Sequence, residues 1–234
     1  MYLVHVQASN GANLIVHGLG NPEEIKATCH QIAQENRVSV TFVDGNLARA
    51  AEIESMMAEI SGKFGGVDIL VNNAGIQHVA PTHEFPVEIY DKIIAINLSA
   101  VFHTTRLAIP HMTKQNWGRI INVASVHGLV GSAKKSPYVA TKHGVIGFTK
   151  ATALEYAQTG VTINAVCPGW VLTPLVEVQI QTKAREQNLS YEDAKRALLM
   201  EKQPSGGFVT TEQLGAMALF LCSDAASEIR GVGA

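Results

Sequence analysis

The sequence has few charged residues and no basic run. Charged side chains make up 16% of the 234 residues, and the formal net charge is −2 with an estimated pI of 6.5. Proteins that bind nucleic acid or an anionic membrane usually carry a concentrated positive charge. We therefore expect neither of them as a partner.

Long apolar runs are also missing. No stretch approaches the roughly 20 apolar residues of a membrane span. Residues 1–10 lack the basic start and apolar centre of a secretory signal. We therefore expect a cytoplasmic protein with no membrane partner.

Patterns that bind metals or form disulfide frameworks are absent as well. Cys29, Cys167 and Cys222 lie far apart with no CxxC pair, and the nine histidines form no HExxH motif. Free thiols in a reducing compartment are the simplest interpretation. We expect no metal site.

What the sequence does contain is enough apolar material for a large core, arranged in an alternating pattern. Hydrophobic residues make up 47% of the chain, which is typical of a folded globular domain. Short β-branched runs predict strands at residues 13–17, 38–43, 69–72, 119–123 and 162–166. Longer amphipathic or capped segments predict helices at residues 22–35, 48–64, 86–115 (with a break near Asn97), 137–157, 173–202 and 211–222, the last capped by Thr210 or Thr211.

This alternation predicts an α/β protein with a doubly wound parallel sheet of the Rossmann type. No linker interrupts it, so we expect a single domain over residues 1–234. Residues 173–202 follow the last clear strand, and ligands of open α/β sheets bind at the carboxyl ends of strands. This segment is either a helical lid over a site or a plain solvated helix pair.

The clearest chemical pattern is formed by Ser125, Tyr138 and Lys142. Tyr138 and Lys142 are four residues apart on one helix face, and Pro137 places Tyr138 near the helix start. A nearby ammonium and the positive helix end both favour a phenolate. Ser125 directly follows a strand, where it can hydrogen-bond a substrate oxygen. The Tyr-x-x-x-Lys spacing by itself also fits an ordinary surface helix.

Further motifs favour the catalytic interpretation over an ordinary surface helix. Asn72-Asn73-Ala74-Gly75 follows one strand, Asn97 lies in the next helix, and Cys167-Pro168-Gly169 follows another strand. Together with Ser125 and the Tyr138-x-x-x-Lys142 pair, these motifs resemble the short-chain dehydrogenase/reductase family. The resemblance runs from about residue 13 to about residue 229.

The resemblance implies a role for each matching residue. Tyr138 is the expected catalytic acid and base, Lys142 lowers its pKa and holds the nicotinamide ribose, and Ser125 polarises the reacting oxygen. Asn97 organises a water that connects Lys142 to solvent. The expected cofactor, NAD, contacts a set of residues at the strand ends: Asn46, Leu47, Asn73, Ala74, Gly75, Tyr138, Lys142, Pro168, Gly169, Val171 and Thr173.

Finer matches suggest the substrate. Gln77 follows the Asn-Asn-Ala-Gly motif, His127 follows Ser125, and Lys135 precedes Tyr138; Trp170 follows Pro168-Gly169, and Gln179 lies in the 173–202 segment. These residues resemble the 3-hydroxybutyrate dehydrogenase branch, which holds a substrate carboxylate with residues matching Gln77, His127, Lys135 and Gln179. One cation and several neutral donors suit a small carboxylate. Each residue also has an ordinary interpretation, as a solvated loop, lid or core side chain.

The sequence departs from the family pattern at both ends. The glycine-rich turn that normally receives the pyrophosphate is not found, so we expect the family's first strand to be absent. The sequence stops at Val232-Gly233-Ala234, where the resemblance implies a further strand, so we expect that last strand to be absent as well. Asn46-Leu47 stands where the family usually has Asp-Leu. Gly18-Leu19-Gly20 offers no arginine for a 2′-phosphate, which favours NAD over NADP.

The leading functional hypothesis is therefore an NAD-dependent oxidoreductase that interconverts D-3-hydroxybutyrate and acetoacetate. Two alternatives remain open. One is another short-chain reductase, for example of 3-oxoacyl thioesters, and the other is a non-catalytic family member that acts as a binding or assembly module. The resemblance also implies a homo-oligomer, usually a tetramer.

Overall fold

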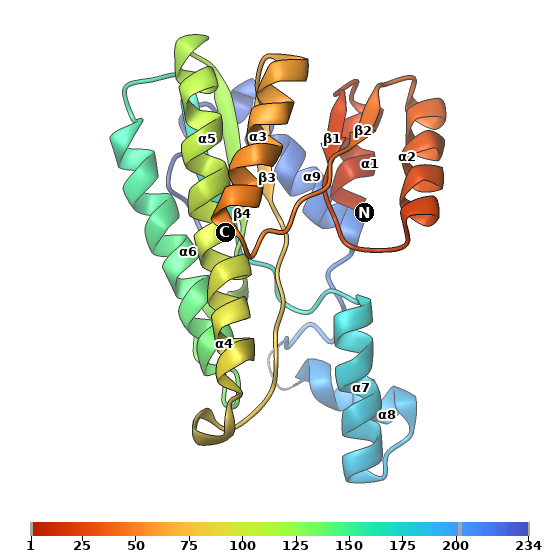
Figure 1. Ribbon diagram of the computed structural model, residues 1–234. Helices are drawn as coiled ribbons and strands as arrows, with labels where there is room; N and C mark the ends of the chain where they lie inside the picture. Colours follow the sequence, from red (N-terminus) through yellow and green to blue (C-terminus); the bar gives the residue numbers. More distant parts are fainter. Residues whose placement is uncertain (1, 201–202, 234) are drawn as a thin grey trace.

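The computed structural model describes residues 2–200 and 203–233, and over this part it has five strands and alternating helices (Figure 1). The strands are β1 (Leu14–Val16), β2 (Val40–Phe42), β3 (Ile69–Asn72), β4 (Gly118–Val123) and β5 (Val161–Val166). Each lies inside or within one residue of an expected strand, because apolar β-branched residues fit a pleated, covered surface. β1 and β2 are shorter than expected.

From α2 onward the helices follow the strands in the expected order, whereas α1 precedes β1 and is not among the predicted helices. They are α1 (Tyr2–Ser9), α2 (Pro22–Asn36), α3 (Ala50–Phe64), α4 (Val87–Ile94), α5 (Ala100–Lys114), α6 (Ser136–Glu155), α7 (Pro174–Gln187), α8 (Tyr191–Met200) and α9 (Thr211–Cys222). The Thr210 side chain caps α9 and forms a capping box with Gln213, which confirms one of the two expected caps.

All strand pairs are parallel, which confirms the expected α/β class. The strands form two sheets, of order β1-β2 and β3-β4-β5. The Rossmann-type parallel arrangement is confirmed, and its described strands are divided between these two sheets. Both sheets nevertheless rest on one core, because Ile15 of β1 and Leu70 of β3 pack against the same cluster, which includes Ile53 and Met112.

The expected helix break near Asn97 is not a break. A π-helical segment, η2 (Ala95–Ser99), joins α4 to α5, so that Val87–Lys114 is a continuous helix. A π-bulge inserts one extra residue into a helix without interrupting it, and such segments are frequent at functional sites. By length and composition alone this helix could cross a membrane. Its buried residues, such as Ala108 and Met112, belong to the core that it shares with α3.

The carboxyl-terminal residues also differ from expectation. Gly233 forms a parallel bridge with Ala165, and the Ala165 amide donates to the Val232 carbonyl at 2.7 Å. A partner for β5 therefore begins here, although we expected that strand to be absent.

The segment predicted as a lid forms two helices, α7 and α8, that lie side by side apart from the sheets at the lower right of Figure 1. They have their own small core, in which Ile180, Ala194 and Leu198 are buried. The predicted end of the segment, Lys202, lies outside the described residues.

Candidate active site

Ser125 and Tyr138 lie together at the carboxyl end of β4. Ser125 caps the short helix η3 (Val126–Gly128), where its Oγ accepts a hydrogen bond from the His127 amide at 3.2 Å. Tyr138 stands in the first turn of α6, directly after Pro137, the second residue of that helix. Burial raises the pKa of Tyr138, and a hydrogen bond with the Ser125 side chain partly lowers it. The net shift is opposite to the lowered pKa that the sequence predicts.

Lys142 is buried one turn further along α6. Its Nζ donates a hydrogen bond to the Val123 carbonyl at 2.7 Å and lies 5.7 Å from the centre of the Tyr138 ring. Burial lowers the pKa of Lys142 to about 8, partly opposed by the Cys167 thiol. At the carboxyl end of β4, a lysine with a lowered pKa therefore lies beside the tyrosine ring.

Asn97 connects the Asn-Asn-Ala-Gly loop to the same place. Its amide donates to the Ile76 carbonyl at 2.8 Å and its Oδ1 accepts from the Ile76 amide at 2.9 Å. A methyl group added to Gly75 would lie 3.5 Å from Asn97 Oδ1 and 3.7 Å from Lys142 Nζ. The π-helical segment thus turns Asn97 toward the loop and brings the loop against Lys142.

A second cluster joins α6 to the α7 helix. Lys135 is buried, its Nζ donates to Gln179 Oε1 at 2.9 Å, and it lies 5.5 Å from the centre of the Trp170 ring. The buried His127 ring meets Tyr138 edge-on, with ring centres 6.2 Å apart. Four of the five residues expected to bind substrate therefore lie in two small groups. His127 lies beside Tyr138, and Lys135, Gln179 and Trp170 lie together at the start of α6.

The fifth, Gln77, is half-buried in the loop after β3. Within the described part of the chain, no hydrogen bond joins Gln77 to either group. Trp170 also packs against the small core of α7 and α8, so it fits both of the interpretations that its sequence position allowed.

The residues expected to contact a cofactor lie at or just beyond strand ends. Asn73, Ala74 and Gly75 are exposed after β3. Asn46, after β2, is exposed and its side chain accepts from the Ala48 amide at 2.9 Å, whereas Leu47 packs against the main core.

The loop after β5 supplies the remaining cofactor candidates. The Pro168 carbonyl accepts from the Val126 amide at 3.0 Å, which ties this loop to the Ser125 turn. Gly169 is exposed, Val171 bridges Val209, and Thr173 occupies the N-cap position of α7 without a capping hydrogen bond from its side chain. These residues therefore border the Ser125 and Tyr138 site from the side of α7.

A buried polar network lies beneath the site and escaped the sequence analysis. Asn72 Nδ2 donates to Asn122 Oδ1 at 2.9 Å, and Asn122 Nδ2 donates to Thr149 Oγ1 at 2.9 Å. Thr104 Oγ1 donates to Asn72 Oδ1 at 2.7 Å. The network ties β3, β4, α5 and α6 together. Its partners are far apart in the sequence, so only the position of Asn72 in the Asn-Asn-Ala-Gly motif could have signalled it.

Comparison with known proteins agrees with this geometry. A family model described as short chain dehydrogenase matches residues 2–184. A D-beta-hydroxybutyrate dehydrogenase from Cupriavidus necator is 59% identical over 96% of this chain and 86% of its own length. A second protein of that name, from Rhizobium meliloti, is 49% identical over 96% of this chain and 87% of its own length.

Among solved structures, a variant of actinorhodin polyketide ketoreductase with NADPH has a TM-score of 0.91 and is 32% identical, over 99% of this chain and 88% of its own. The sheet architecture, the Ser125, Tyr138 and Lys142 cluster and these matches agree with one another. The chain belongs to the short-chain dehydrogenase family and is an oxidoreductase.

Proposed function

We propose that this enzyme interconverts D-3-hydroxybutyrate and acetoacetate with NAD as cofactor. The single observation that carries the substrate is the Lys135 cluster. A buried lysine that donates to Gln179 Oε1 at 2.9 Å, in a site that also holds His127, offers a cation and neutral polar groups to a small carboxylate. The two relatives described above, both named for this substrate, support the assignment.

The catalytic steps are assigned to Ser125, Tyr138 and Lys142. Bound NAD supplies the hydride acceptor during oxidation and, when reduced, the hydride donor. Tyr138 takes the hydroxyl proton during oxidation and returns a proton to the ketone oxygen during reduction. Ser125 donates a hydrogen bond to that oxygen and stabilises its developing charge. Lys142 favours the phenolate of Tyr138 electrostatically.

Burial of Tyr138 fits the reduction direction of this reaction, whereas oxidation needs the opposing effect of Lys142. Its raised pKa keeps the phenol protonated near neutral pH, which is the form that donates a proton to a ketone. The same burial excludes water, so the hydrogen bond from Ser125 acts in a medium of low dielectric constant. We assign the Asn73–Gly75 loop to the adenosine half of the cofactor and the loop from Pro168 to Thr173 to its nicotinamide end. The exposed Asn73–Gly75 loop adjoins the Lys142 ammonium, which supports a cofactor site at this strand end.

The start of α2, which follows β1, favours NAD over NADP. Glu23 and Glu24 occupy its first turn, and the Asn21 side chain already accepts from the Glu23 amide at 2.9 Å. Two carboxylates there repel the additional phosphate of NADP. Gly18-Leu19-Gly20, just before, offers no arginine to a 2′-phosphate.

The remaining assignments extend the same proposal. We assign the chain to one cytoplasmic catalytic domain, with α7 and α8 as a lid that carries Gln179 to the site, and with no metal, nucleic acid or membrane involved. A homo-oligomer, tetrameric as the family resemblance implies, is part of the proposal. Apolar side chains exposed on α4, α5 and α6, such as Val87, Phe102 and Leu154, support self-association.

The Tyr138→Phe variant tests the catalytic assignment. It removes only the hydroxyl, so turnover of D-3-hydroxybutyrate should fall at least about a thousandfold while the midpoint of thermal unfolding stays nearly unchanged. NADH absorbance gives the rate, and circular dichroism gives the unfolding midpoint. Retained turnover by a folded variant would remove Tyr138 from the mechanism.

A further inference from the structure

The segments that lead into and out of the α7–α8 helix pair are joined to each other by main-chain contacts. Trp170 and Val171 lie just before α7, and Val209 lies after α8 and just before α9. The Val209 amide donates to the Trp170 carbonyl at 2.9 Å, and Val171 forms a parallel bridge with Val209. The two segments therefore run side by side at the base of the helix pair.

Gln203 adds a side-chain contact to this junction. Its Oε1 accepts a hydrogen bond from the Trp170 amide at 2.8 Å, and its Nε2 donates to the Gly207 carbonyl. Its main-chain amide donates to the Leu199 carbonyl of α8 at 2.8 Å. One half-buried glutamine therefore joins the end of α8, the segment after it and the segment before α7.

Gly169 shows how closely the main chain approaches this glutamine. A methyl group added to Gly169 would lie 2.8 Å from Gln203 Oε1. The same oxygen accepts the hydrogen bond from the Trp170 amide. A side chain at position 169 would therefore displace the Gln203 amide from Trp170.

The contacts of Gln203 extend to the Lys135 cluster through Trp170. The Trp170 amide is bonded to Gln203 and its carbonyl to Val209, and its ring packs against the small core that contains Ile180. From this position the ring lies 5.5 Å from the Lys135 Nζ. An ammonium is attracted to an aromatic ring at this distance. The position of Trp170 therefore helps to set the position of the Lys135 ammonium.

We propose that Gln203 is a positioning residue for substrate binding, which acts by holding Trp170 against Lys135. The proposal rests on the proposed function, because it is there that Lys135 receives the substrate carboxylate. Without the Gln203 amide, Trp170 and Lys135 are less ordered before the substrate arrives. Ordering them then takes up part of the binding free energy. Substrate affinity should fall, while the chemical step at Tyr138 is retained.

The fluorescence of Trp170 tests this positioning without any substrate. The chain has two tryptophans, Trp117 and Trp170, so Trp117→Phe leaves Trp170 as the only one. In this background Gln203→Met removes both side-chain hydrogen bonds at a similar side-chain size. Quenching of Trp170 by acrylamide should rise at least about twofold, because a loosened segment exposes the ring more often. Unchanged quenching in a folded Gln203→Met variant would overturn the proposal.

Steady-state kinetics at saturating NAD test the consequence for the substrate. Loss of one neutral hydrogen bond changes a binding constant roughly three- to tenfold. Gln203→Met should raise the KM for D-3-hydroxybutyrate by that factor and leave kcat within about twofold. A merely structural role would lower kcat together with the midpoint of thermal unfolding. An unchanged KM, or a lower kcat at unchanged KM, would contradict the proposal.

The two readouts separate this proposal from the proposed function. If the wild type failed to oxidise D-3-hydroxybutyrate, the proposed function would be wrong, and acrylamide quenching would still decide whether Gln203 positions Trp170.

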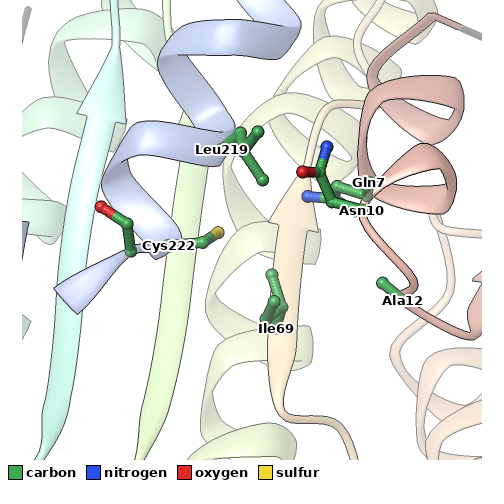
Figure 2. Close-up of a pocket in the computed structure, with 7 residues that line it drawn as sticks. Gln7, Asn10, Ala12, Ile69, Leu219 and Cys222 are labelled. Carbon is green, nitrogen blue, oxygen red and sulfur yellow. The ribbon is translucent and has the colours of Figure 1, made fainter.

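Gln7→Met is the matched control. Gln7 is also a half-buried glutamine, but it lines a cavity between α1, β3 and α9 (Figure 2), away from α7 and α8 (Figure 1). The control should change neither the quenching of Trp170 nor the KM. Equal effects of Gln7→Met and Gln203→Met would contradict a specific role of Gln203.

Gly169→Ala disturbs the same contact from the other side and remains available if Gln203→Met does not fold. Its methyl group displaces Gln203 Oε1 from the Trp170 amide, so quenching and KM should both rise. Wild-type quenching and KM in Gly169→Ala would overturn the proposal. In a double-mutant cycle, Gly169→Ala should add little to Gln203→Met, because both changes remove one interaction. Fully additive effects on KM would contradict that shared cause.

Discussion

Lys142 shows how one buried side chain shapes the chemistry of this site. The ammonium has lost most of its water, and the Val123 carbonyl at 2.7 Å replaces only part of it. Its pKa consequently falls from the ordinary 10.5 to about 8. A lysine in this state is poised near physiological pH, which suits a group that assists proton exchange at Tyr138.

This depressed pKa predicts a pH dependence of stability. Below a pH of about 8 the lysine is charged in both states, and the folded state bears the full cost of burying it. Between about 8 and 10.5 the folded protein loses the proton while the unfolded chain keeps it, so the free energy of unfolding should rise with pH. The shift corresponds to roughly 3 kcal/mol.

The Lys142→Met variant isolates this effect. Urea unfolding at a pH of about 7 and of about 10 gives the stability difference for each protein. The wild type should gain stability relative to the variant between the two pH values. An identical pH dependence of both proteins would show that Lys142 keeps an ordinary pKa.

Gln7 makes a second prediction at this scale. Because its Nε2 is buried without a partner, Gln7→Leu should raise the free energy of unfolding of the chain by about 1 kcal/mol. Asn10→Leu is the matched control, since the Asn10 amide already donates to the Val6 carbonyl at 2.8 Å. A higher free energy of unfolding in Gln7→Leu but not in Asn10→Leu would confirm the unsatisfied donor. A lower free energy of unfolding in Gln7→Leu would contradict it.

At the scale of elements, helix ends place the functional side chains. Pro137 lies in the first turn of α6, so Tyr138 stands in that turn and Lys142 one turn later. The π-helical segment between α4 and α5 turns Asn97 toward Ile76. The sequence predicts α6 and its residues well, because proline and the four-residue spacing are local signals. It does not predict the π-bulge, because apolar periodicity is almost the same in a π-bulge and an α-helix.

The contact between α6 and α7 leads to a prediction about substrate binding. Lys135→Met removes a buried ammonium beside Gln179, and a charge-assisted hydrogen bond contributes about 1.5–3 kcal/mol. The KM for D-3-hydroxybutyrate should therefore rise roughly ten- to hundredfold. Steady-state kinetics give the KM of the wild type and the variant, first for D-3-hydroxybutyrate and then for a 3-hydroxyacyl thioester.

Lys134→Met is the control, because this neighbouring lysine is exposed and should leave KM unchanged. A KM unaffected by Lys135→Met would favour the thioester reductase alternative, whose substrate has no free carboxylate.

At the scale of the whole molecule, the parallel α/β class and the order of elements could be predicted from the sequence. Apolar β-branched runs, capping residues and breakers are local and act within a few residues. The division into two sheets could not be predicted in this way, since it depends on which strand lies beside which. The Asn72, Asn122 and Thr149 network is equally non-local, because its two bonds span 50 and 27 residues.

Cofactor binding involves all three scales. It depends on the Lys142 side chain, on the Asn73–Gly75 loop beside it, and on the parallel sheet whose strand β3 ends at that loop. The most direct measurement is calorimetric titration of the purified chain with NAD, followed by addition of D-3-hydroxybutyrate while NADH absorbance is recorded. The proposed function predicts saturable NAD binding and an absorbance increase that depends on the substrate. A folded chain that binds NAD but leaves the hydroxybutyrate unoxidised, or that binds no NAD, would contradict it.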